Sequence, residues 1–106
     1  MSETFARILS LVDRGVYLVS NHAYDELSDE QIHPEDLLLG LADAEVIEDY
    51  PAAFRGPSVL VLQNDRDGVV HTVWGIPKHH NEPAVLITAY RPQPTRWSPD
   101  FRRRRT

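Results

Sequence analysis

The sequence of 106 residues contains no cysteine, which excludes disulfide bonds and thiolate metal sites. It has no apolar run near the ~20 residues that a membrane-spanning helix needs. The first four residues, Met-Ser-Glu-Thr, lack the basic and apolar parts of a secretory signal. We therefore expect a cytoplasmic protein that does not enter a membrane. Hydrophobic residues make up 42% and charged residues 25%, an ordinary globular composition.

Basic residues are also missing from one long stretch. Between Asp25 and Asp49 there are ten acidic residues and no Lys or Arg. Residues 1–54 carry 12 acidic residues against Arg7 and Arg14, a net charge of −10, whereas residues 55–106 carry 4 against 9 basic ones, a net charge of +5. Such a run is typical of a solvated helical face, or of a two-sided molecule whose basic half contacts phosphate. The overall charge of −5 argues against strong non-specific nucleic-acid binding.

The common catalytic motifs are absent. There is no glycine-rich phosphate loop, no Gly-x-Ser-x-Gly elbow and no His-Glu-x-x-His helix. Of the five histidines, His79 and His80 stand beside Glu82, but adjacent residues on an extended chain point apart and no spaced partner follows. His33 precedes Pro34 and is expected at a helix start. We expect neither a metal nor a cofactor.

The apolar spacing predicts helices first and strands afterwards. Gly15 ends a first amphipathic helix, residues 16–19 form a strand or an extended link, and Ser20 or Asn21 caps a second helix that runs to about residue 32. Pro34 opens a third helix through residue 41. Period-two segments then predict strands at residues 45–50, 58–63, 69–75 and 84–90, with a turn at residues 65–68 between the second and the third.

This order of elements predicts an α+β fold, with two or three N-terminal helices packed on a four-stranded antiparallel sheet. After the last strand, prolines prevent regular structure and four arginines follow. We expect an extended Pro/Arg-rich C-terminal arm, a single domain over residues 1–101, and a basic, disordered tail over residues 102–106.

The end of the last predicted strand is the most informative place to look for a site. Thr88 and Tyr90 lie two residues apart, so their hydroxyls share one face of a strand, and Arg91 adds a cation beside them. His22 opens the second helix and His71 lies in the middle of a strand. For each histidine, a half-buried residue bonded to a backbone carbonyl is the structural alternative to a general base.

Metal-free RNA cleavage needs a base for the 2′-hydroxyl, an acid for the leaving oxygen and a cation for the phosphate. His, Tyr and Arg can fill these roles. We predict catalytic roles for His22, His71, Tyr90 and Arg91, and substrate binding by Thr88, Lys78 and Arg96.

Several segments together resemble the family called domain of unknown function 4258, over roughly residues 16–101. They are Asn21-His22-Ala23, residues 46–50, Arg55-Gly56-Pro57-Ser58, His71-Thr72-Val73, and residues 87–92 with Trp97. The family is often grouped with the RelE-like and barnase-like small toxin ribonucleases, and some members are thought to pair with a zinc-finger antitoxin. The resemblance implies a helix-plus-four-stranded-sheet fold, an RNA-cleaving role, and functional matches at His22, His71, Thr88 and Tyr90.

The chain departs from the family in one respect. Relatives commonly carry an Arg soon after the helix-opening His, where this sequence has Asp25 and Glu26. Carboxylates beside a phosphate site repel the substrate.

Three hypotheses for the function follow from these observations. The first is a toxin-like ribonuclease acting on RNA. The second is a non-catalytic binding or regulatory domain that uses its acidic helical face as a partner surface. No motif supports the third, a small-molecule enzyme. Monomer and dimer both stay open.

Overall fold

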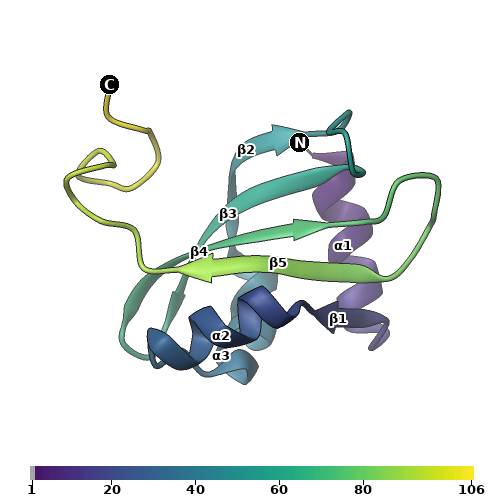
Figure 1. Ribbon diagram of the computed structural model, residues 1–106, viewed down its shortest axis with the longest axis horizontal. Helices are drawn as coiled ribbons and strands as arrows, with labels where there is room; N and C mark the ends of the chain where they lie inside the picture. The colour runs from purple at the N-terminus through teal and green to yellow at the C-terminus, as the bar shows by residue number, and fades with distance from the viewer. Residues whose placement is uncertain (1) are drawn as a thin grey trace.

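A computed structural model describes residues 2–106 and shows an α+β fold (Figure 1). Within these residues there are three α-helices, one short 3₁₀ helix and five strands. Their bounds are α1 Glu3–Asp13, β1 Tyr17–Val19, α2 Asn21–Asp29, α3 Pro34–Gly40, η1 Leu41–Asp43, β2 Glu45–Tyr50, β3 Ser58–Asp65, β4 Gly68–Gly75 and β5 Ala84–Tyr90.

The helices begin where the sequence offers a cap. Ser2 accepts the Phe5 amide hydrogen at 3.1 Å, and Ser20 accepts that of Ala23 at 3.0 Å, so each hydroxyl satisfies an amide with no partner inside the helix. α3 starts at a proline, as predicted. The predicted end of α2 near residue 32 is wrong, because α2 stops at Asp29 and Gln31 takes a left-handed backbone with φ 55°.

The sheet has the strand order β1-β5-β4-β3-β2. Neighbours from β2 to β5 are antiparallel, but β1 pairs with β5 in parallel, with Tyr17 opposite Ala84. The expected sheet of four antiparallel strands is therefore wrong, since residues 2–106 form a mixed sheet of five strands. Parallel partners lie far apart in the chain, so no turn residue marks their pairing in the sequence.

One face of the sheet holds the core. Val59 and Val61 of β3, Val70 and Trp74 of β4, and Leu86 of β5 are at most 2% exposed and pack against the helices. The helices contribute apolar residues at spacings of three or four to the same cluster, among them Ile8, Leu11, Ala23, Leu27 and Leu37. Because side chains alternate along a strand, residues such as Leu60 of β3 and Val73 of β4 point to the opposite face, called here the open face.

The strand registers arrange the open face into rows. One row runs across β2, β3, β4 and β5 through Glu45, Leu62, His71 and Tyr90. The next row holds Glu48, Leu60, Val73 and Thr88. Two residues predicted for the site, His71 and Tyr90, are thus direct cross-strand neighbours.

Residues 92–106 lie at the end of the sheet where β5 finishes (Figure 1). They turn back on themselves, since the Arg105 amide donates to the Arg96 carbonyl at 2.9 Å and Trp97 forms an isolated bridge with Arg104. An extended arm is therefore not confirmed. Arg102 binds Glu45 at 2.8 Å and Arg104 binds Glu48 at 2.8 Å, which ties the segment to the edge strand β2. The domain boundary at residue 101 and the disorder of residues 102–106 stay predictions.

None of the helices in residues 2–106 is long and apolar enough to span a membrane.

Candidate functional site

His71 is fully buried at the point where the C-terminal segment meets the open face. Its Nε2 lies 2.9 Å from the carbonyl oxygen of Phe101, and its Nδ1 lies 3.3 Å from the hydroxyl of Tyr90. A carbonyl only accepts, so the contact with Phe101 places the ring hydrogen of neutral His71 on Nε2. Nδ1 is then a lone-pair acceptor, and the Tyr90 hydroxyl donates to it.

Aromatic rings enclose this imidazole. The Trp97 ring centre lies 4.4 Å from that of His71 at an interplanar angle of 83°, and the Tyr90 ring centre lies at 5.3 Å and 75°. Both are edge-to-face arrangements, which aromatic quadrupoles favour. Burial lowers the pKa of His71 below its usual value, although the Phe101 carbonyl and the Glu48 carboxylate oppose this. The ring is therefore neutral at pH 7 and able to accept a proton.

Charged groups from several elements act on the Tyr90 hydroxyl. Burial raises its pKa above the ordinary value, the Arg104 guanidinium lowers it, and the carboxylates of Glu48 and Glu26 raise it. Tyr90 therefore stays protonated near neutral pH. A proton transfer through this hydroxyl has to be concerted, with Nδ1 of His71 taking the phenol proton as another proton arrives.

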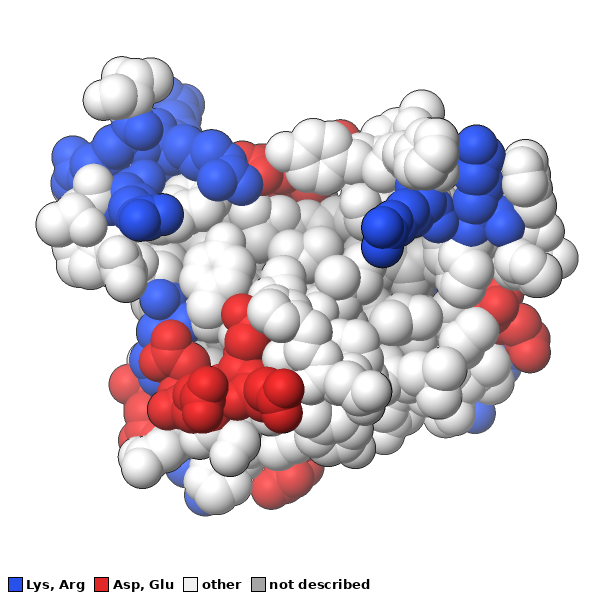
Figure 2. Space-filling view, viewed as in Figure 1, with Lys and Arg blue, Asp and Glu red and all other residues white. Residues whose placement is uncertain are grey.

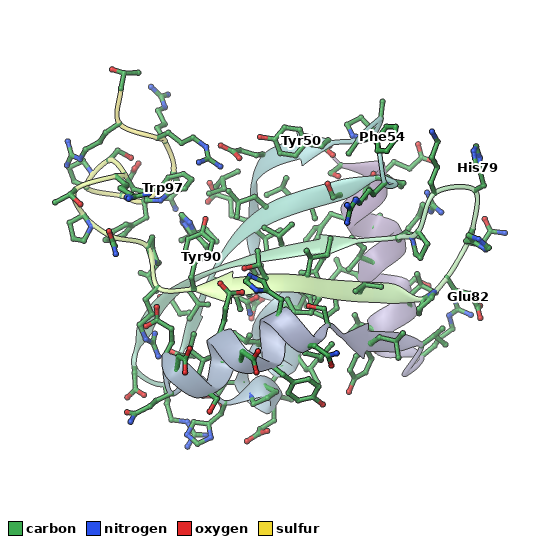
Figure 3. The ribbon with its side chains drawn as sticks, viewed as in Figure 1. Tyr50, Phe54, His79, Glu82, Tyr90 and Trp97 are labelled. Carbon is green, nitrogen blue, oxygen red and sulfur yellow. The ribbon has the colours of Figure 1, made fainter. Side chains whose placement is uncertain are left out.

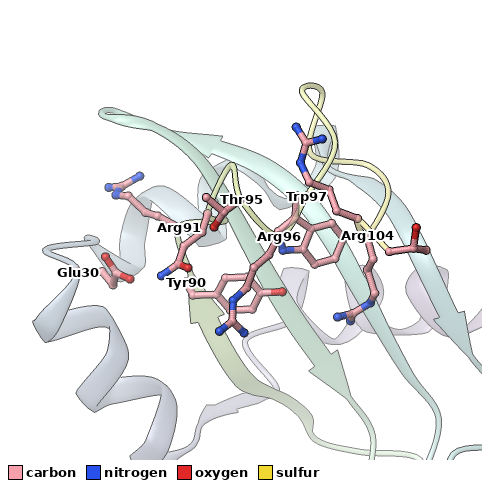
Figure 4. A pocket seen from close by; sticks show the side chains of 10 residues that line it. Glu30, Tyr90, Arg91, Thr95, Arg96, Trp97 and Arg104 are labelled. Carbon is pink, nitrogen blue, oxygen red and sulfur yellow. The ribbon is translucent and has the colours of Figure 1, made fainter.

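Tyr90 also lines an open pocket of about 700 Å³ between the end of β5 and the C-terminal segment. Figure 4 shows Tyr90, Arg96, Trp97 and Arg104 grouped around it. Arg105 and Arg91 contribute further cations, while Glu30 is the one acid among the lining residues. Within residues 2–106, no ion pair involves Arg96 or Arg105. Guanidinium groups bind phosphate in a planar, two-bond geometry, so this wall can bind a phosphodiester.

Arg91 lies at the pocket but already has partners. Its two terminal nitrogens donate to the Asp65 carboxylate at 3.1 and 2.8 Å, and Asp65 is completely buried at its side chain. This pair holds the pKa of Asp65 below its usual value. Arg91 therefore fastens the end of β5 to the β3–β4 hairpin, and much of its charge is neutralised there.

His22 and Thr88 form a separate group. Nε2 of His22, which is 71% exposed at its side chain, lies 3.3 Å from Oε1 of Glu26 on the next turn of α2. The same oxygen accepts the Thr88 hydroxyl and, at 3.1 Å, the Ala89 amide hydrogen. The structure thus brings His71, Tyr90 and Arg96 together, and places His22 and Thr88 along the outer edge of β5.

Lys78 lies away from both groups. It follows β4 in the loop at the other end of the sheet, with its Nζ 5.4 Å from the Phe54 ring centre. His79 and His80 belong to the same exposed loop. No group of three metal-ligating side chains occurs within residues 2–106.

Four contributors to the site were not predicted from the sequence. The carbonyl of Phe101 is a backbone group, so residue type gives no signal for it. Arg104 and Arg105 were assigned to a disordered tail, and Glu48 was only part of an acidic run. For Arg104 and Glu48, one signal existed, since a block of arginines and a block of acids in one chain favours pairing.

The comparisons with known proteins give a family and no activity. The chain belongs to the family described as domain of unknown function (DUF4258), which matches residues 19–91. That segment runs from the end of β1 to Arg91 and includes His22, His71 and Tyr90. No curated protein and no solved structure matches the chain significantly.

Proposed function

Membership of a family of unknown function sets no activity, and we propose that this protein is a metal-independent endoribonuclease. One observation carries the proposal. The Tyr90 hydroxyl faces the lone pair of a neutral, buried His71 whose tautomer is set by the Phe101 carbonyl, and it does so at the wall of an arginine-rich pocket. A proton acceptor, a proton carrier and phosphate-binding cations are what cleavage by the 2′-hydroxyl needs.

The reaction can be written with these groups alone. As the 2′-oxygen attacks phosphorus, its proton passes to the Tyr90 oxygen while the Tyr90 proton passes to Nδ1 of His71. The bond between phosphorus and the 5′-oxygen breaks, and the proton returns through Tyr90 to that oxygen. The products are a 2′,3′-cyclic phosphate and a 5′-hydroxyl. Arg96 and Arg105 would stabilise the additional phosphate charge in the transition state.

Glu26 fits this proposal better than its charge suggests. Its carboxylate is bonded to Thr88, Ala89 and His22, so it supports the edge of β5 next to the site. Asp25 is an exposed residue of the same helix. Asp25 and Glu26 therefore do not line the arginine-rich pocket, where Glu30 at the end of α2 is the acid present.

The resemblance to small toxin ribonucleases extends the proposal to a biological role. Under it, the protein is the toxin of a toxin–antitoxin pair and acts on RNA in the cytoplasm, with a small zinc-finger protein as its antitoxin. Expression in a bacterial host should then arrest growth, and co-expression of a genomic neighbour of that type should restore it.

The test compares Tyr90→Phe with Tyr24→Phe on single-stranded RNA. Tyr24 is a matched control because its hydroxyl is on α2 and its side chain is exposed. Tyr90→Phe removes the proton carrier without changing ring packing, so cleavage should fall by about 10²–10⁴-fold, while Tyr24→Phe keeps the wild-type rate.

Two solution conditions test the mechanism further. EDTA should have no effect on the cleavage rate. The wild-type rate should fall as the pH drops below the usual His range, because protonated His71 cannot accept.

Equal cleavage by Tyr90→Phe and wild type would contradict the assignment. RNA binding by the wild type without any cleavage would instead favour the second hypothesis, a non-catalytic binding domain. The melting temperature of each variant shows whether a loss of rate reflects unfolding.

A further inference from the structure

A second hollow lies on the open face, at the far end from Tyr90. It has a volume of about 270 Å³ and a floor made by Ser58, Gly75, Val85 and Ile87. The space exists because Gly75 has no side chain, since a Cβ there would lie 2.9 Å from Cδ1 of Ile87. The floor is continuous with the row of Val73 and Thr88, which separates it from the row of His71 and Tyr90.

Large apolar side chains are exposed in this hollow and in the segment next to it, since Ile87 lines it and Phe54 lies between the lining residues Ala53 and Arg55. Phe54 is 85% exposed, Tyr50 48% and Ile87 40%. Figure 3 shows Tyr50 and Phe54 at one margin of the open face and Tyr90 and Trp97 toward its other end. Single exposed apolar residues are normal on a protein surface, whereas a cluster of them beside a hollow is typical of a binding surface.

The charges at the hollow favour an anionic occupant. Arg55 lines it, and Lys78 lies against the Phe54 ring. Neither forms an ion pair within residues 2–106. Figure 2 shows basic side chains at two separate places on this face, with a pale, hollowed surface between them and acidic side chains along one side. Exposed aromatic rings beside free cations fit nucleobases joined by phosphates.

We propose that this hollow is a second base-binding subsite, so that single-stranded RNA crosses the open face from the Tyr90 pocket to Phe54. A base stacks on Phe54, and Arg55 and Lys78 bind the phosphates beside it. The inference rests on the proposed ribonuclease function and adds how the substrate is held. Its substrate class is single-stranded RNA, because paired bases cannot stack on a protein side chain.

The strand geometry sets the distance between the two subsites. His71 and Gly75 are four residues apart on β4, which corresponds to about 13 Å at ~3.3 Å per residue. A dinucleotide bound at Tyr90 would therefore not reach Phe54, whereas a longer RNA would. The acidic residues of α2 flank the path on the β5 side and direct the phosphates toward the cations.

The test measures binding of oligoadenylates of increasing length, from a dinucleotide to a decanucleotide. Their 2′-O-methyl groups prevent cleavage. Phe54→Ala should weaken binding of the long oligonucleotides by about 5- to 150-fold, the usual loss for one stacked base, and leave the dinucleotide unaffected. Leu39→Ala is the matched control, because Leu39 is 82% exposed on α3, and it should leave every affinity unchanged. Lys78→Ala should reduce the salt dependence of long-strand binding, and Arg14→Ala should not.

The outcomes separate the two proposals. If the wild type cleaves RNA through Tyr90 but Phe54→Ala and Leu39→Ala bind all lengths equally, the second subsite is wrong and the ribonuclease proposal stands. If the wild type neither binds nor cleaves RNA, both are wrong. A protein that binds long strands through Phe54 without cleaving them would retain the subsite on a non-catalytic domain.

Discussion

At the scale of single residues, Glu26 shows how one side chain can serve the fold at a position expected to serve the substrate. β1 ends at Val19, so the next polar backbone groups of β5 have no strand to pair with. The Ser20 hydroxyl donates to the Ile87 carbonyl at 3.0 Å, and Glu26 accepts the Ala89 amide hydrogen at 3.1 Å. α2 thereby closes an edge that would otherwise be open to another strand.

Replacing Glu26 with Ala should therefore destabilise the protein. The Ala89 amide and the Thr88 hydroxyl would lose their acceptor in a partly buried place, which costs about 1–3 kcal/mol. Asp25→Ala is the control on the same helix, and its effect should stay within about 0.5 kcal/mol. Urea unfolding of both variants measures the difference. Equal midpoints for the two variants would show that the β5 edge does not need the carboxylate.

At the scale of elements, the tip of the β3–β4 hairpin is held to the first turn of α3. The Arg66 side chain binds both oxygens of Asp36, at 2.8 and 3.0 Å, and the Arg66 amide donates to the same carboxylate at 3.2 Å. The hydrogen bond from the Arg66 side chain is the main cause that lowers the pKa of Asp36 to about 2. The unfolded chain, with an ordinary Asp pKa near 3.9, binds a proton first on acidification.

This pair predicts a defined loss of stability in acid. Because the folded pKa is depressed, the contribution of Asp36 is present above about pH 4 and is lost as the pH falls toward 2. Asp36→Asn removes the titrating group and keeps its shape. The unfolding free energy of the wild type should thus fall more steeply over this range than that of the variant. Parallel curves would contradict the ion pair.

The sequence predicted elements well where their signals are local. The strands at residues 45–50 and 84–90 have the predicted bounds, and the caps and prolines mark the helix starts. It did not predict β1 as a paired strand, because its partner Ala84 is 67 residues away and only three residues pair. For the site, alternation placed Thr88 and Tyr90 on one face, but which histidine meets Tyr90 depends on the β4–β5 register.

At the scale of the whole molecule, the acidic first half and the basic second half neutralise each other at several places. Three arginines of residues 55–106 pair with carboxylates of residues 1–54, in the pairs Arg66–Asp36, Arg102–Glu45 and Arg104–Glu48. Two of these fasten the C-terminal segment, and this segment supplies the Phe101 carbonyl and the Trp97 ring to His71. The electrostatic division of the sequence thus becomes a means of assembling the candidate site.

Loss of Arg104 should loosen this segment, whereas loss of Arg103 should not. Arg104 binds Glu48 and lies 4.8 Å from the Trp97 ring centre, while Arg103 forms no ion pair within residues 2–106. Arg104→Ala should shift Trp97 fluorescence to longer wavelength. Arg103→Ala is matched in charge and should keep the wild-type spectrum. Because the other tryptophan, Trp74, is fully buried in the core, Trp97 dominates any shift, and Trp97→Phe should abolish it.

Salt and acid should reproduce the effect of Arg104→Ala in the wild type. Ion pairs near the surface weaken as salt screens them. The Arg104–Glu48 pair therefore contributes at most about 1 kcal/mol to the free energy of unfolding. Arg104 holds the pKa of Glu48 below its usual value, so the pair persists until the pH falls below the ordinary Glu range. The same conditions should raise backbone mobility over residues 102–106 in NMR relaxation. If Trp97 emission is identical in both arginine variants and at all salt concentrations, aromatic packing alone holds the segment, and the arginines are free to bind RNA.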